Sequence, residues 1–278
     1  MSFININGEI VASGQATISV ANRAFKYGDG LFESMRMMNG KLMFADQHAQ
    51  RLREGMDVLQ IEEISVISPE FLEEKVRQLA IRNNIKDNAR VRMTVFRDSE
   101  GLYSPTANHM GYVIEMTRTD QADYASNYKG LIAQVYEDIT KPINILSNLK
   151  TCNSLLYVMA GIFRKKNSLD EVFILNQKGF LCEGMSTNLF VLYQQTLYTP
   201  ALEEGCIAGV MRSVVIGLAE ENGIQVIEAQ INPDILNEAD EVFVTNATNG
   251  IQWIMGFNGK RYFNKLSNEF LGYLNAIS

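Results

Sequence analysis

The sequence holds little cysteine and histidine, and each shortage excludes a class of protein. Its three cysteines, Cys152, Cys182 and Cys206, are odd in number and widely spaced, so they form neither a disulfide framework nor a CxxC metal motif. The two histidines, His48 and His109, are too few for an ordinary histidine metal site. We therefore expect no metal ion, and a reduced cytoplasm is the compartment that fits best.

The sequence also lacks long apolar runs and blocks of basic residues. No apolar run approaches the ~20 residues of a membrane-spanning helix, so we expect no association with a membrane. Residues 1–10 lack the basic start and the apolar core of a signal peptide. The net charge of −7, without any basic block, argues against nucleic acid as a partner.

The composition that remains is that of a globular protein. Hydrophobic residues make up 46% of the chain and charged residues 21%. A length of 278 residues allows one large or two medium domains. Residues 119–126 are polar and show no clear periodicity, which is typical of a domain boundary. We predict a small N-terminal domain over residues 1–118, an interdomain linker over 119–126, and a large C-terminal domain over 127–278.

Local patterns predict both strands and helices. Residues 3–12 (FININGEIVA) predict two short strands around an Asn-Gly turn. Asp46 can cap a helix over residues 46–61. The positions of this helix that are expected to face the core are Leu52, Met56 and Leu59. Strand and helix patterns alternate along the rest of the chain, so we expect an α/β or α+β fold.

Two residues stand where a chemical role is plausible. Lys150 directly precedes an apolar helical run, and Glu183 with Gly184 stands in a loop between the strand-like runs DEVFILN and TNLFVLYQQTLYT. Taken alone, this pair fits a surface lysine at a helix start and a glutamate in a turn equally well.

Five motifs in a fixed order change that balance. R-x-x-x-Y-G-D-G-x-F-E and H-x-x-R-L come first, followed by Lys150, then E-G-x-x-x-N-x-F and G-V-M-R. This order resembles the class IV pyridoxal-phosphate enzymes, which are branched-chain aminotransferases, D-amino acid aminotransferases and aminodeoxychorismate lyases. The resemblance covers the chain from about Asn5 to Ile254.

The resemblance implies a fold, a cofactor and an assembly. It implies a two-domain α/β (α+β) fold of type IV, with pyridoxal 5'-phosphate at the interface between a small N-terminal and a larger C-terminal domain, and a homodimer. In that family a lysine forms an aldimine with the cofactor and later moves the Cα proton, which here would be Lys150. An acid facing the ring nitrogen keeps the nitrogen protonated, which here would be Glu183.

The phosphate of the cofactor needs positive charge and N–H donors. By resemblance Arg51 of H-x-x-R-L supplies the charge, through a planar fork that matches phosphate oxygens. The start of the helix at G-V-M-R supplies backbone amides. The remaining residues implied to contact the cofactor are Ile207, Gly209, Val210, Met211, Asn246, Ala247 and Thr248. Met211 stands where many aminotransferases have threonine, so one hydroxyl contact is lost.

Substrate contacts follow from the resemblance with alternatives left open. Tyr27 and Phe32 are implied to line the substrate pocket, although both also fit aromatic packing in a core. Branched-chain enzymes have an arginine near the position of Arg92, and some D-amino acid aminotransferases have one near Arg97. The two arginines are an odd number of residues apart on one strand, so they point to opposite faces. We favour Arg97 as the residue that binds the substrate carboxylate.

Two reactions share this scaffold. We expect an aminotransferase that moves an amino group between an amino acid and a 2-keto acid. The alternative is 4-amino-4-deoxychorismate lyase, which eliminates pyruvate to leave 4-aminobenzoate. K-T-x-N at Lys150, G-V-M-R without threonine, and T-N-A at Thr245 favour the lyase. DSEGLYSP, where many lyases have a glycine-rich run, argues against it. The amino donor and its D or L preference are left open.

Overall fold

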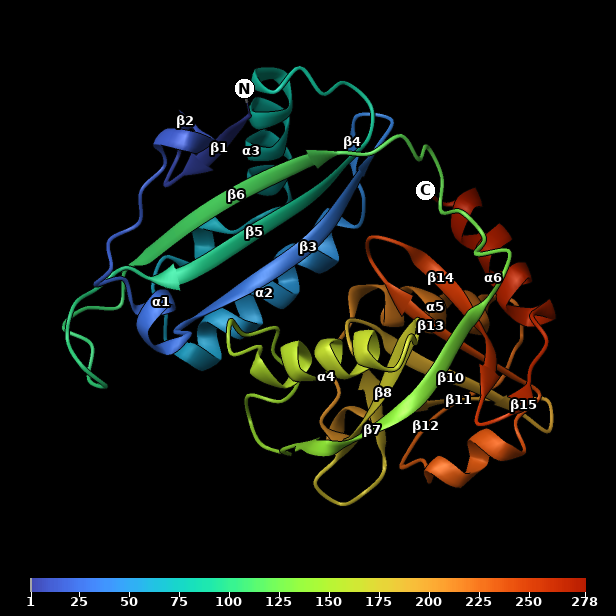
Figure 1. Ribbon diagram of the computed structural model, residues 1–278. Coiled ribbons are helices and arrows are strands. Elements are labelled where there is room, and N and C mark those ends of the chain that lie inside the picture. Colours follow the sequence, from blue (N-terminus) through green and yellow to red (C-terminus); the bar gives the residue numbers. More distant parts are fainter. Residues whose placement is uncertain (1) are drawn as a thin grey trace. The chain divides into compact units, whose positions relative to one another are not determined.

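In the computed structural model, which describes residues 2–278, the chain divides by its contacts into two units (Figure 1). The first unit comprises Met1–Ala122 and Leu149–Asn153, and the second comprises Asp123–Asn148 and Ser154–Ser278. The short segment Leu149–Asn153 differs from expectation, because it lies within the range predicted for the C-terminal domain. It carries Lys150, so this lysine belongs to the same unit as the N-terminal motifs.

The first unit contains a six-stranded antiparallel sheet in the order β2-β1-β6-β5-β3-β4. Its strands are β1 (Phe3–Ile6), β2 (Glu9–Ala12), β3 (Gly30–Met38), β4 (Lys41–Leu42), β5 (Ala89–Arg97) and β6 (Met110–Arg118). The predicted hairpin at residues 3–12 is confirmed, since β1 and β2 pair around Asn7 and Gly8, which both have positive φ.

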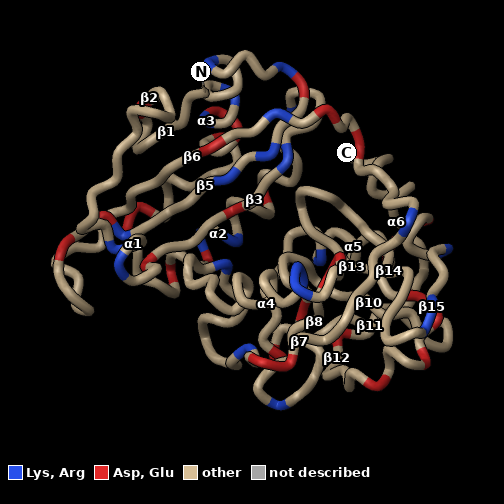
Figure 2. Tube along the Cα trace, viewed as in Figure 1, with Lys and Arg blue, Asp and Glu red and all other residues tan. Residues whose placement is uncertain are grey.

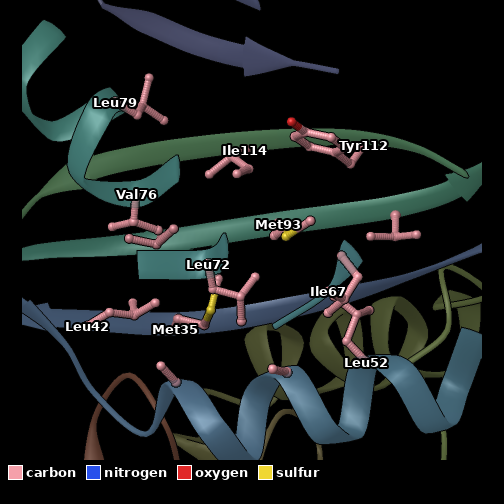
Figure 3. Packing of buried hydrophobic residues seen from close by; sticks show 14 of the residues in the cluster. Met35, Leu42, Leu52, Ile67, Leu72, Val76, Leu79, Met93, Tyr112 and Ile114 are labelled. Carbon is pink, nitrogen blue, oxygen red and sulfur yellow. The ribbon is translucent and has the colours of Figure 1, made fainter. Parts of the chain in front are cut away.

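Two helices cover the side of this sheet that forms the core. They are α2 (Ala45–Leu59) and α3 (Pro69–Arg82), and a single turn of helix, α1 (Arg23–Tyr27), precedes β3. Figure 3 shows Met35 of β3 and Met93 of β5 between the two helices, in one buried cluster with Leu52 of α2 and Val76 of α3. Burying these side chains contributes about 25 cal/mol for each Å² of apolar surface, which holds both helices on the sheet.

The two helices begin in different ways. Ser68 caps α3 by accepting a hydrogen bond from the Phe71 amide at 3.1 Å, which is the usual role of serine at this position. The prediction that Asp46 caps α2 was wrong. The N-cap is Phe44, in a left-handed conformation, and Asp46 lies in the first helical turn, where its charge favours the helix dipole.

The second unit contains a nine-stranded mixed sheet in the order β12-β11-β10-β13-β14-β7-β8-β9, with β15 paired to β14. The strands are β7 (Leu131–Lys141), β8 (Glu171–Asn176), β9 (Leu181–Gly184), β10 (Asn188–Tyr193), β11 (Thr196–Pro200), β12 (Val226–Ala229), β13 (Glu241–Asn246), β14 (Gly250–Phe257) and β15 (Lys260–Arg261). β7 runs parallel to both β8 and β14.

Helices pack on this second sheet. α4 (Leu155–Lys166) contacts β7 and β8, whereas α5 (Val210–Glu221) and α6 (Lys265–Ala276) contact β13 and one another. The C-cap of α5 is Asn222, and the following Gly223 has a φ of 68°, a left-handed conformation that suits glycine after a helix end. Four short 3-10 helices complete the described chain, η1 (Ser13–Gln15), η2 (Ile64–Val66), η3 (Leu202–Glu204) and η4 (Pro233–Asn237).

Two expectations in this unit need correction. The run TNLFVLYQQTLYT forms two strands, β10 and β11, because Gln194 and Gln195 both adopt positive φ and turn the chain. Glu183 lies within β9, opposite Ile174 of β8, and not in a loop. Over residues 2–278, none of the helices combines the length and the apolarity that crossing a membrane requires.

Candidate active site

Lys150 is fixed in the first unit by backbone hydrogen bonds to the start of β3. The Phe32 amide donates to the Lys150 carbonyl at 2.9 Å, and the Cys152 amide donates to the Gly30 carbonyl at 2.9 Å. Leu31 and Thr151 form an antiparallel bridge between these two bonds. This short added strand brings the Lys150 side chain to Phe32, with Nζ 4.6 Å from the centre of the ring.

The ring of Phe32 carries a second cation. The guanidinium carbon of Arg92 lies 3.7 Å from the ring centre, which is the geometry of a cation–π contact. β3 and β5 place the two residues on the sheet face opposite the core, and Figure 2 shows basic positions on both of these neighbouring strands. The structure thus brings together three residues that the sequence analysis singled out, Lys150, Phe32 and Arg92.

Arg51 is held by a buried acid on the same unit. Its Nε donates to Glu33 Oε1 at 2.8 Å, and its Nη2 donates to Glu33 Oε2. His48, one turn earlier on α2, lies 2.7 Å from Glu33 Oε2 through Nδ1. Glu33 points from β3 into the helix-covered side of the sheet, so strand and helix together set the direction of the guanidinium. Arg51 was predicted from H-x-x-R-L, whereas the motif that contains Glu33 did not indicate a role for it.

This buried trio has strongly perturbed charges. Burial alone would raise the pKa of Glu33, but the positive charge of Arg51 and the contact with His48 outweigh burial and hold that pKa at about 2. Burial lowers the pKa of His48, with smaller contributions from the charges of Arg51 and Lys150, while Glu33 acts in the opposite direction. Glu33 is therefore an anion and His48 a neutral donor at neutral pH.

Arg97 has a set of partners that leaves it a structural role. Its guanidinium donates to Asp29 at 3.0 Å and to the carbonyls of Leu59 and Gln60 at the end of α2. The side chain is 9% exposed and lies on the core side of the sheet. The two arginines do point to opposite faces, as expected. The preference for Arg97 as the substrate-binding residue loses its support, because Arg92 is the exposed arginine beside Phe32.

Tyr27 belongs to the same structural network. Arg23 pairs with Asp29 at 2.7 Å, and its guanidinium lies 5.1 Å from the centre of the Tyr27 ring. The ring also packs at 5.5 Å against Tyr103. Tyr27 is half-buried, and in this unit its ring contacts are with residues that hold the segment around Tyr103 in place.

Glu183 is a buried carboxylate held by three donors in the second unit. Lys141 Nζ lies 2.5 Å from Oε1, the Tyr157 hydroxyl donates to Oε1 at 2.6 Å, and the Ile207 amide donates to Oε2 at 2.8 Å. Ile207 was implied to contact the cofactor, but its backbone bond to Glu183 was not predicted. Lys141 and Tyr157 were not predicted either, because no motif contains either residue.

The phenol of Tyr157 and the two thiols near Glu183 stay neutral near physiological pH. Burial raises the pKa of Cys206 to about 12, and Glu183 acts in the same direction. Burial also raises the pKa of Cys182 and of Tyr157, and the Glu183 charge again acts in the same direction on both. A cluster of buried groups whose pKa values are strongly perturbed is a common feature of functional sites.

The start of α5 presents backbone donors. Gly209 is the N-cap residue, and no side chain of residues 2–278 makes a capping hydrogen bond there. A Cβ at Gly209 would lie 1.8 Å from Asn188 Oδ1, so this approach requires glycine. Asn188 in turn donates to the Ile207 carbonyl at 2.8 Å and fixes the chain before the helix. Val210 and Met211 are buried in the first turn of α5.

The end of β13 supplies a second group of polar atoms. Thr245 is 1% exposed, and its hydroxyl has no hydrogen-bond partner within residues 2–278. Asn246 Oδ1 accepts bonds from the Thr248 amide and hydroxyl at 3.1 and 2.9 Å, so Asn246 shapes this turn. The Ala247 carbonyl accepts from Tyr124 at 3.3 Å. A buried hydroxyl without a partner, near a polar turn, suits an anionic ligand group.

Comparison with known proteins identifies the family. The model of class IV amino-transferases matches residues 30–255, which is most of the chain. The chain therefore belongs to the class IV aminotransferases, and it is an enzyme.

Two curated relatives match nearly the whole chain. A Methanocaldococcus jannaschii protein, provisionally named a branched-chain-amino-acid aminotransferase, is 30% identical over 274 residues, which is 96% of this chain and 91% of the relative. A Listeria monocytogenes D-alanine aminotransferase is 28% identical over 268 residues, which is 91% of this chain and 87% of the relative.

Solved structures with a similar fold include aminotransferases and a lyase. A Thermoproteus uzoniensis branched-chain aminotransferase solved with norvaline has a TM-score of 0.88 at 21% identity, covering 99% of this chain and 94% of its own. A T.th. branched-chain amino acid aminotransferase with pyridoxamine 5'-phosphate has a TM-score of 0.87 at 21% identity, covering 98% and 92%. A Legionella pneumophila protein, provisionally named a 4-amino-4-deoxychorismate lyase, has a TM-score of 0.84 at 22% identity, covering 96% and 97%. These likenesses confirm the predicted fold class.

Proposed function

We propose that this aminotransferase uses pyridoxal 5'-phosphate, with Lys150 as the covalent attachment point and Glu183 as the partner of the ring nitrogen. The observation that carries the proposal is the buried carboxylate of Glu183, which three donors hold in one orientation. When bound, the cofactor supplies an electron sink for the charge left on the substrate Cα after its proton is removed. A fixed anion at the ring nitrogen is the group this chemistry needs.

The residues present fit the other parts of the cofactor. The uncapped amides at the start of α5 and the unpartnered Thr245 hydroxyl provide donors for a phosphate. Arg51 provides a permanent positive charge, and Glu33 fixes its orientation. We assign phosphate contacts to Arg51, Gly209, Val210, Met211, Asn246, Ala247 and Thr248, and a ring contact to Ile207.

The chain's own residues divide the reaction among them. The amine of Lys150 holds the cofactor and, once released, takes the proton from the substrate Cα. Glu183 keeps a proton at the ring nitrogen. We assign the substrate carboxylate to Arg92 because its guanidinium is exposed and lies on the same aromatic ring as Lys150. Phe32 separates these two cations and lines the substrate position.

Reduction with borohydride tests the lysine assignment. The purified protein is loaded with pyridoxal 5'-phosphate, reduced and digested, and the labelled peptide is identified by mass spectrometry. We expect the label on Lys150, its loss in Lys150→Ala, and its retention in Lys178→Ala, an exposed lysine of the second unit. A label on Lys141 or on any other lysine in the wild-type protein contradicts the assignment.

Amino acids and 2-keto acids are the proposed substrates, and a second copy of this chain is the proposed partner. α4 carries Leu155, Val158, Met159 and Ile162 at helical spacing, and each is more than 40% exposed. A two-fold axis would pair this face with itself and cover it. Light scattering should give a dimer for the wild type and for Lys166→Glu, and a monomer for Ile162→Glu. A wild-type monomer contradicts the proposal.

The three free thiols are consistent with a cytoplasmic protein.

A further inference from the structure

A buried lysine that belongs to none of the motifs pairs with the carboxylate of Glu183. The Lys141 Nζ lies 2.5 Å from Glu183 Oε1, and the two side chains are 7% and 3% exposed. Of the lysines and arginines in residues 2–278, only Lys141 forms an ion pair with Glu183. Burying two charges costs several kcal/mol of desolvation for each ion, so the sequence would not retain this pair for packing alone.

An irregularity in the sheet places this lysine. β7 and β8 pair in regular register as far as Tyr136 and Ile174, and the register then shifts before Lys141 meets Asn176. Because Ile174 also pairs with Glu183 on β9, the shift returns the end of β7 to the neighbourhood of that carboxylate. Such irregularities are common next to active sites, where the extra residues change the direction of a side chain.

We propose that Lys141 is a positioning residue for transamination, which keeps Glu183 ionised and leaves the Oε2 atom of that carboxylate to the cofactor ring nitrogen. This inference rests on the proposed function. Within residues 2–278, Oε1 is occupied by two donors, Lys141 and Tyr157, whereas Oε2 accepts only the Ile207 amide. Each carboxylate oxygen can accept about two hydrogen bonds, so the remaining acceptor direction belongs to Oε2.

The charge of Lys141 matters because other groups near Glu183 cannot replace it. The titratable and charged groups that interact with Glu183 or with its immediate neighbours are Tyr157, Cys182, Cys206, Glu204 and Arg212. Burial keeps the phenol and both thiols protonated at neutral pH, and Glu204 is an acid. Arg212 is directed elsewhere, with its Nη2 donating to the Pro200 carbonyl and to Glu228. Without Lys141, burial would favour the neutral form of the carboxyl.

The pH dependence of unfolding separates this charge effect from packing. In the folded Lys141→Met protein the buried carboxyl takes up a proton, whereas the same carboxyl in the unfolded chain is already ionised. Unfolding of this variant therefore releases a proton and becomes more favourable as the pH rises. The melting temperature of this variant should therefore fall further below wild type as the pH increases from about 5 to about 9. At the alkaline end we expect a deficit of roughly 5–10 °C.

Three further variants make the unfolding result decisive. Lys141→Arg keeps the cation, and the double variant Lys141→Met with Glu183→Gln removes the ionisable group, so neither should show a pH-dependent deficit. Lys129→Met removes an exposed lysine for which the described residues offer no ion pair, and it should follow wild type throughout. A deficit of Lys141→Met that is the same at every pH would overturn the inference, because only lost packing behaves in that way.

Cofactor affinity gives a second measurement that does not depend on turnover. We expect Lys141→Met to bind pyridoxal 5'-phosphate at least about tenfold more weakly near pH 6 than near pH 9, relative to wild type at each pH. Lys141→Arg should recover most of the loss. An affinity loss independent of pH, in a protein whose Lys150 is still labelled by borohydride, overturns this inference alone. A wild type that is not labelled at Lys150 overturns the proposed function instead.

Discussion

Arg51, Glu33 and His48 show how a phosphate-binding arginine is prepared at the scale of single residues. The bidentate bond with Glu33 uses the Nε and Nη2 side of the guanidinium and prevents rotation of the side chain. His48, which is completely buried, fixes Glu33 in turn. Because the guanidinium is already held in one orientation, binding of a ligand costs less side-chain conformational entropy.

Replacing Arg51 should therefore affect both stability and cofactor retention. In Arg51→Ala the buried Glu33 loses its ion partner, so the free energy of unfolding should fall by about 3 kcal/mol. Cofactor should also be lost more readily on dialysis. Arg77→Ala is the matched control, because Arg77 pairs with Glu74 on the exposed side of α3 and should change little. Equal losses in both variants, or full cofactor retention by Arg51→Ala, would contradict the assignment.

Glu33 should also govern the response to acid. Its folded-state pKa of about 2 lies below the ordinary value of 4.5, so the unfolded chain binds more protons between these pH values. The stabilisation is present above about pH 4.5 and is lost as the pH falls toward 2, a span that corresponds to about 3 kcal/mol.

The variant Glu33→Gln isolates this contribution. The difference in unfolding free energy between wild type and Glu33→Gln, measured with urea, should be largest near neutral pH and should shrink below about pH 4.5. Glu269→Gln, at an exposed position on α6, provides the reference for a carboxyl without such partners. A difference that does not change with pH would show that Glu33 contributes shape and not charge.

At the scale of elements, β5 explains why only one of its two arginines is available to a substrate. Successive side chains of a strand point to opposite faces, so Arg97 enters the helix-covered side while Arg92 stays exposed beside Phe32. The alternation was predictable from the sequence. The identity of the helix-covered face was not, since it depends on where α2 ends and presents the carbonyls of Leu59 and Gln60.

The N-terminus of α5 offers a test with a matched control on the same helix. Gly209→Ala forces Asn188 to move and to lose its bond to the Ile207 carbonyl, so we expect a loss of about 1–3 kcal/mol and weaker binding of phosphate. Gly217→Ala, where an added Cβ meets no atom within 4 Å, should stabilise the helix by about 0.5–1 kcal/mol. Thermal unfolding and cofactor titration measure both effects. Stabilisation by Gly209→Ala would contradict the described packing.

Local patterns predicted those elements whose signals lie close together in the sequence. The hairpin of β1 and β2 and the core positions of α2 were of this kind. The cap of α2 and the turn between β10 and β11 were not, because Phe44, Gln194 and Gln195 adopt positive φ without the residue types that usually signal it. The contact between Lys141 and Glu183 was not predictable for another reason. The two residues are 42 positions apart, and Lys141 reaches Glu183 only after a register shift in the sheet.

At the scale of the whole molecule, the chemical groups are distributed over both units of the chain. The first unit holds Lys150, Arg51 and Arg92, and the second holds Glu183 and the start of α5. The motif order predicted the family, and the family model confirmed it. The return of Leu149–Asn153 to the first unit was not predictable from composition, because its five residues are held there by backbone bonds to β3.

The absorption spectrum of the purified protein with pyridoxal 5'-phosphate, before and after a panel of D- and L-amino acids, tests the central claim most directly. We predict a visible band of the lysine-bound cofactor that bleaches with at least one amino acid and returns when a 2-keto acid is added. The amino acid that bleaches the band identifies the donor class. A band that no amino acid changes, in a protein that releases pyruvate from aminodeoxychorismate, would contradict transamination and favour the lyase.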